Sequence, residues 1–190
     1  LLAAGGLVLH LRGEASNAKH PLLELELSAA ILATCCAAIV ALAIRLDPSG
    51  VRCLGLWPGR HVRAAVAGLA SYGMMLPAIF GIGLAWPWLL TKCGIEFEPQ
   101  AVLKQMRILT PVDRPIAILL GVAVIPLLEE ILFRGFLQPL LVQNLSDKLG
   151  VVVTSLVFAT LHGPGAFLPI FVLSLVLGAT MLRTQRLFAV

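Results

Sequence analysis

Three charged residues with the means for acid–base chemistry, Glu129, Glu130 and Arg134, lie in an apolar run, 116–145, that carries no other charge. One charge at bilayer depth costs about 2.5 to 3.5 kcal/mol, so three are tolerated only where they pair or line a wet cavity. On a helix, Glu130 and Arg134 share a face in the order that favours an ion pair. Glu129 is rotated about 100° from Glu130. It is therefore the carboxylate less neutralised by Arg134, and the better candidate for catalysis.

His162 is a second residue that could take part in acid–base chemistry. It comes directly at the end of an expected apolar helix, 150–161. Phe158 lies four residues earlier, so its ring is expected one turn from the imidazole on the same face. The short connection 146–150 predicts that this helix and the Glu129 helix are antiparallel neighbours. We therefore expect the Glu129 carboxyl to face His162 across an internal cavity, directly or through one water.

Such a pair can activate water. A desolvated carboxylate can accept a proton from water, while a histidine hydrogen-bonds the oxygen that becomes negative. Pro126 cannot donate to the carbonyl of Val122, and that break is expected to widen the helix and admit water beside the acid. Two alternatives stay open from the residues alone. Glu130 with Arg134 can be a structural ion pair, and His162 can form an interhelical hydrogen bond.

The composition places these residues in a membrane protein. Hydrophobic residues make up 59% of the chain, charged residues 13%, and the mean hydropathy is +0.97. These values predict an all-α, polytopic transmembrane helical bundle. The net charge of +4 would suit nucleic acid in a soluble chain, but the basic residues lie in short connections where they set topology. The lipid bilayer is thus an expected partner, and nucleic acid is not.

The apolar runs predict how the chain is divided. Spans are expected at 27–44, 64–90, 116–145 and 166–182, with a shorter apolar helix at 150–161, a partial helix at 1–11 and a surface helix at 101–109. Pro77 and Trp86-Pro87-Trp88 are expected to interrupt the second span, and Gly163-Pro164-Gly165 predicts a turn. We expect a single membrane-embedded domain over 1–190, truncated at both ends.

With Glu129-Glu130-x-x-x-Arg134 followed by Phe158-x-x-x-His162, the chain resembles the CAAX prenyl protease and bacteriocin-processing (CPBP, abortive-infection-like) family of intramembrane endopeptidases. The resemblance covers 116–190, the expected catalytic core. It implies that Glu129 is the general base and that His162 orients water or stabilises the oxyanion. Glu130, Arg134 and Phe158 would support them. It also implies a third motif, with a second histidine, beyond Val190, so these 190 residues alone are expected to lack part of the site.

The resemblance implies a membrane-embedded peptidase that cleaves a peptide or membrane protein, which prenylation can mark, in the inner (plasma) membrane of a bacterium. No cofactor is expected. If a metal is present, Glu129 and His162 would be its ligands, but they do not form a complete zinc set. The four cysteines show no Cys-x-x-Cys spacing that would indicate a zinc knuckle. The alternatives are a proton-coupled transporter, in which Glu129 and His162 relay protons, and a catalytically silent scaffold or immunity protein of the same fold.

Overall fold

The computed structural model describes residues 21–46, 61–95, 109–184 and 187, and within these ranges the regular structure is helical, with no strand. The elements are α2 (Pro21–Leu46), α4 (His61–Lys92), α6 (Asp113–Leu119), η1 (Leu120–Val124), α7 (Ile125–Glu130), η2 (Ile131–Leu137), α8 (Gln138–Asn144), α9 (Asp147–Thr160) and α10 (Phe167–Thr184). Four helical segments are long and apolar enough to cross a membrane, namely 25–45, 68–92, 113–144 and 167–184. The protein is a polytopic, all-helical membrane protein, as the composition predicts.

The segment from α6 to α8 is one continuous helical rod, in which two wider π-helical turns, η1 and η2, interrupt the α-helix. Each π turn comes directly before a helix with proline in its first turn, Pro126 in α7 and Pro139 in α8. A proline cannot donate to the carbonyl four residues earlier, and a wider turn accommodates that missing bond. The widening expected at Pro126 is therefore confirmed, and η2 places Arg134 on a second widened turn.

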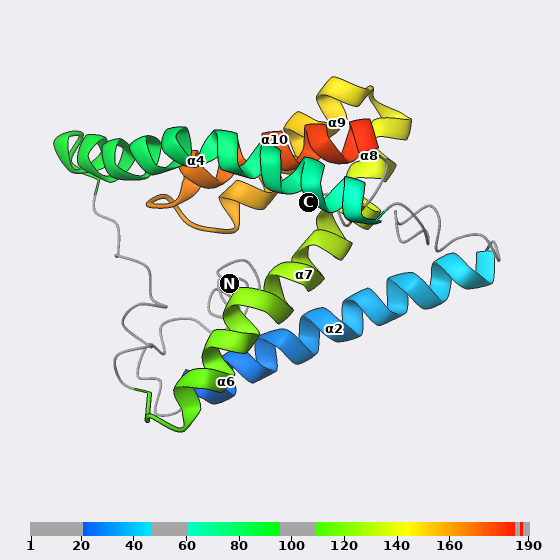
Figure 1. The fold of residues 1–190 in the computed structure, drawn as a ribbon, viewed down its shortest axis with the longest axis horizontal. Helices are drawn as coiled ribbons and strands as arrows, with labels where there is room; N and C mark the ends of the chain where they lie inside the picture. Colours follow the sequence, from blue (N-terminus) through cyan, green and yellow to red (C-terminus); the bar gives the residue numbers. More distant parts are fainter. Residues whose placement is uncertain (1–20, 47–60, 96–108, 185–186, 188–190) are drawn as a thin grey trace.

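The rod packs against two groups of helices (Figure 1). On one side, α2 contributes Ala29 and Leu32 to a small core around Ile125, and the Cys36 thiol donates to the carbonyl of Leu128 at 3.3 Å. On the other side, α8 packs on α9, and α10 packs on both α9 and α4. The Glu129 and Arg134 region thus lies where α2, α9 and α10 approach the rod.

Two expected boundaries were wrong. Helix α4 continues through both Pro77 and Pro87, because membrane helices tolerate proline where neighbouring groups and local adjustments satisfy the freed carbonyls. Helix α9 begins at Asp147, not at residue 150, because Ser146 caps it: the Ser146 hydroxyl accepts the N–H of Leu149 at 3.4 Å.

Other expectations have mixed outcomes. The predicted turn before α10 is confirmed, with Gly163 at a φ of 79° that favours glycine. The partial helix expected at 1–11 lies outside the described residues, as does nearly all of the surface helix expected at 101–109.

Candidate active site

The charged cluster is buried at the junction of α7 and η2. The Glu129 side chain is 3% exposed and Arg134 is 0% exposed. An Arg134 Nη1 atom lies 3.5 Å from Glu130 Oε1, which confirms the predicted i, i+4 ion pair. This distance is long and does not satisfy hydrogen-bond geometry, so the contact is an electrostatic pair and not a bidentate clamp. The cluster therefore contains the Glu130–Arg134 charge pair and a second carboxylate, Glu129.

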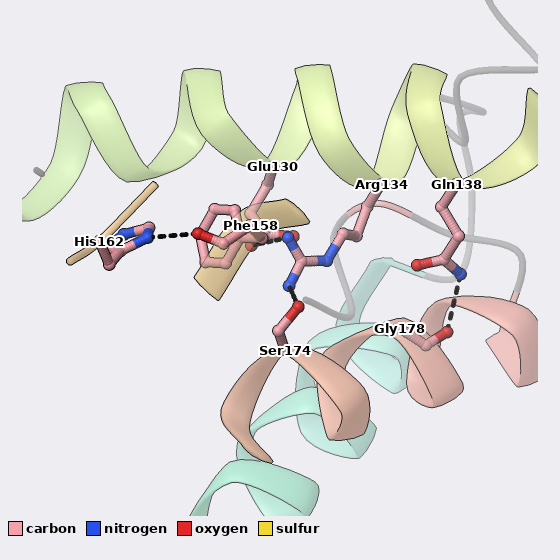
Figure 2. A network of polar contacts seen from close by, with 7 residues as sticks. All are labelled: Glu130, Arg134, Gln138, Phe158, His162, Ser174 and Gly178. Carbon is pink, nitrogen blue, oxygen red and sulfur yellow. Dashed lines mark hydrogen bonds and ion pairs between the residues drawn. The ribbon is translucent and has the colours of Figure 1, made fainter. Parts of the chain in front are cut away.

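Arg134 is also held from two other helices (Figure 2). Its Nη2 atom donates to the Ser174 hydroxyl of α10 at 2.9 Å, and both side chains are fully buried. Its guanidinium carbon lies 4.6 Å from the centre of the Phe158 ring of α9, which is a cation–π contact. The guanidinium thus joins α7, α9 and α10 at one point, and its orientation is fixed from three sides.

Phe158 connects Arg134 to His162. The Phe158 and His162 ring centres are 4.5 Å apart, so the predicted shared face is confirmed. The Nδ1 atom of His162 lies 2.7 Å from the carbonyl oxygen of Phe158. Phe133 packs its ring against the edge of Phe158, with centres 4.8 Å apart. His162 is therefore fixed both through its ring nitrogen and through the aromatic ring on which it packs.

His162 lies in the turn between α9 and α10, outside the four segments that are long enough to span. Burial lowers the pKa of its imidazole below the ordinary value, although the hydrogen bond to the Phe158 carbonyl and the charge of Glu129 raise it. At neutral pH the imidazole is therefore uncharged. The turn itself is attached to α4, because the Trp86 indole N–H donates to the carbonyl of Pro164 at 2.7 Å.

Glu129 belongs to the same electrostatic cluster as His162 and Arg134, since its charge acts on both groups. The structure thus brings together the five residues that the sequence singled out, Glu129, Glu130, Arg134, Phe158 and His162. The expectation that Glu129 reaches His162 directly or through one water remains a prediction.

The sequence reasoning missed a second polar contact between the rod and α10. Gln138, which is 2% exposed, donates through Nε2 to the carbonyl of Gly178 at 2.9 Å. Figure 2 shows Glu130, Arg134 and Gln138 along one side of the rod, with Ser174 and Gly178 on the facing helix. Their spacing of four residues on the rod, and of four on α10, was the available signal. A hydroxyl or amide in an apolar span is also a candidate for a hydrogen bond between helices.

The described residues do not by themselves supply a complete set of ligands for a catalytic zinc ion. Among the described residues, no three His, Cys, Asp or Glu side chains are grouped so that they could hold a metal. A catalytic zinc is held by three protein ligands, and Glu129 with His162 would supply two.

The four apolar helices define an integral membrane protein, and its candidate site is the buried charged cluster at the helix junction around Arg134. Residues 111–190, which contain the whole cluster, match the family described as type II CAAX prenyl endopeptidase Rce1-like. This part of the chain is therefore similar to a family of CAAX-type proteases, which are hydrolases. No curated protein and no solved structure matches the chain.

Proposed function

We propose that this protein is an intramembrane endopeptidase in which Glu129 activates a water molecule and His162 orients it. The observation that carries the proposal is the burial of Glu129 in one electrostatic cluster with His162, on residues that match a protease family. The family match favours this function over a proton-coupled transporter.

The chemistry requires a base that can take and return one proton. Glu129 removes a proton from water, and the water oxygen attacks the carbonyl carbon of the scissile peptide bond. The resulting tetrahedral intermediate collapses as the C–N bond breaks, and Glu129 returns the proton to the leaving nitrogen. Burial supports this role, because exclusion of bulk water strengthens the interaction of the carboxylate with the water that it activates.

The contact of His162 with Phe158 bears on which role the imidazole takes. A carbonyl oxygen only accepts hydrogen bonds, so Nδ1 of His162, 2.7 Å away, must carry the proton. In the neutral ring Nε2 then has a lone pair and no proton. It can accept a hydrogen bond from the attacking water, but it cannot donate to an oxyanion unless the ring becomes protonated. The geometry therefore favours water orientation over oxyanion stabilisation.

Glu130 and Arg134 take supporting roles in this proposal. Their ion pair offsets a positive charge that is fully buried. Because Glu130 is paired with Arg134, the guanidinium is held towards the Glu130 side and against Phe158. Glu129 is the carboxylate that takes the proton in this mechanism.

The substrate class follows from the placement of the site in a membrane protein. A peptide bond near the membrane surface, in a peptide or a membrane protein, would approach the site from the side of His162, which lies in the turn after α9. A prenylated CAAX peptide is one such substrate, since its isoprenoid partitions into the bilayer. We place the protein in a bacterial inner membrane.

The test is cleavage of a quenched fluorogenic peptide that carries a farnesylated CAAX sequence, by full-length protein in liposomes. Glu129→Ala should reduce turnover by at least about 10²- to 10⁴-fold while the fold survives, and Glu129→Gln should do no better because an amide cannot take the proton. Glu26→Ala, which alters an exposed glutamate of α2, is the matched control and should keep wild-type turnover.

The same assay is run with a strong zinc chelator, in which turnover should persist. Loss of turnover in chelator, with recovery on added zinc, would refute the proposed metal-free mechanism and reassign Glu129 and His162 as ligands. A folded wild-type protein that cleaves neither this peptide nor its unprenylated counterpart would instead support a silent scaffold of the same fold.

A further inference from the structure

Helix α10 makes two buried polar contacts with the rod, and both have the same spacing. Arg134 donates to the Ser174 hydroxyl at 2.9 Å, and Gln138 donates to the Gly178 carbonyl at 2.9 Å. Arg134 and Gln138 are one helical turn apart on the rod, and Ser174 and Gly178 are one turn apart on α10. A shift of α10 along the rod would break both contacts together. The pair therefore fixes the position of α10 along the rod (Figure 2).

The packing at Gly178 fixes the distance between α10 and its neighbours as well. A Cβ atom at this position would lie 2.8 Å from Gln138 Oε1 and 2.9 Å from Val151 Cγ1. Both distances are shorter than real Cβ contacts, so Gly178 permits a close approach of α10 to α8 and α9. Ser174, one turn away, is brought to the guanidinium by that close approach.

Ser174 is the point at which this contact reaches the cluster. Its hydroxyl is the acceptor for Nη2 of Arg134, whose guanidinium packs on Phe158. Phe158 in turn contacts His162 by its ring and accepts the Nδ1 hydrogen bond through its carbonyl. A continuous series of contacts thus runs from α10 to the imidazole, through side chains that are buried or nearly so.

We propose that Ser174 is a positioning residue of the active site, which holds Arg134 in the orientation that places Phe158 and His162. This inference rests on the proposed function. Ser174 itself does not touch the reacting atoms. It acts because a buried guanidinium that loses an acceptor must turn towards another one, and a turned Arg134 no longer supports the Phe158 ring.

The charged and titratable groups around Arg134 determine where it would turn. Glu130 and Glu129 are on the rod itself, and His162 follows α9. On α2, the Cys36 thiol already donates to the Leu128 carbonyl, and the described part of α10 has its one charged side chain, the exposed Arg183, in its last turn. Glu129 and Glu130 are therefore the carboxylates towards which a released guanidinium would turn, and a closer contact with Glu129 would compete with its role as a base.

The experiment compares Ser174→Ala with Ser155→Ala in the full-length protein. Both changes remove the hydroxyl of a buried serine, at 0% and 1% exposure, but within the described residues the Ser155 hydroxyl has no hydrogen-bond partner. Ser174→Ala should lower kcat by about 10- to 100-fold, as misplacement of catalytic groups does, with KM unchanged. Ser155→Ala should keep both constants. Ser174→Cys, which retains side-chain volume but has a weak acceptor, should behave as Ser174→Ala and replaces it if that variant does not fold.

A second measurement does not depend on turnover. Diethyl pyrocarbonate modifies neutral imidazole, and mass spectrometry reports the rate at His162 alone. Ser174→Ala should raise this rate relative to Ser155→Ala, because His162 loses the support of Phe158. A rate equal to that of Ser155→Ala would overturn the proposal for Ser174, even if the kcat had fallen. If Glu129→Gln retained turnover, the proposed function would fail, while the modification rates would still decide the role of Ser174.

Discussion

Replacement of Gly150 by alanine tests the packing that joins the two halves of the site. Gly150 lies in the first turns of α9, and a Cβ atom there would be 2.6 Å from Val142 Cγ2, 2.7 Å from Val142 N and 2.8 Å from Val142 Cα. Two of these three atoms are backbone, so no side-chain rotation relieves the contact. Helices α8 and α9 would have to separate by about 0.7 Å, the difference between 2.7 Å and the 3.4 Å at which ordinary contact begins.

The expected loss of stability in Gly150→Ala follows from a comparison with Gly81→Ala in α4. A Cβ at Gly81 has nothing within 4 Å, so that variant reports the helix-propensity gain of alanine without a clash. The gain is common to both variants and cancels in their difference. What remains is the overpacking cost, about 1 to 3 kcal/mol. Gly150→Ala should therefore be less stable than Gly81→Ala by this amount.

The assay is equilibrium unfolding of both variants in the same detergent, followed by the peptide-cleavage assay. Gly150→Ala should also lose turnover, because α8 continues from the turn that carries Arg134 and α9 carries Phe158, whose contact is 4.6 Å. Equal stability of the two variants would refute the argument that backbone contact at Val142 sets the spacing of α8 and α9.

Two other predictions concern the charged cluster. Glu130→Gln should lower the folded yield in detergent more than Glu129→Gln, because breaking a buried ion pair costs about 3 to 5 kcal/mol. The folded yield is measured by size-exclusion chromatography. Equal yields for the two variants would contradict this division of roles. Burial lowers the pKa of His162 below 6.5, and its imidazole is neutral above the lowered pKa. Cleavage that needs the neutral ring should therefore be lost as the pH falls through the lowered pKa. His162→Gln should remove this acid limb from the pH–rate profile, and a limb centred above pH 6.5 would contradict the prediction.

The class of the protein was determined by the sequence alone. With 59% hydrophobic residues in long runs, the backbone polar groups can be satisfied in a bilayer only by helices or a closed barrel, and the runs have helix length. The contacts within single helices were equally predictable. Glu130 with Arg134 and Phe158 with His162 are i, i+4 pairs, and helical geometry brings such pairs together wherever the helix lies.

The boundaries were less predictable from the sequence, for identifiable reasons. Pro77 and Pro87 predicted an interruption of the helix, but α4 is continuous through both. Membrane helices tolerate proline because neighbouring groups and local adjustments satisfy the carbonyls that the proline leaves without a donor. The predicted start of α9, at residue 150, was three residues late. The prediction followed the apolar run, whereas the helix begins directly after the Ser146 cap.

Only the tertiary structure decided which residues support the cluster from other helices. Ser174 and Gly178 are forty residues from their partners Arg134 and Gln138, and Trp86 is further still from Pro164. Nothing in local spacing relates such positions, since their contact depends on the crossing of α10 with the rod and with α4. Gly178 permits the close approach of α10 to α8 and α9, and this approach brings Ser174 to a guanidinium whose sequence position was evident but whose neighbours were not.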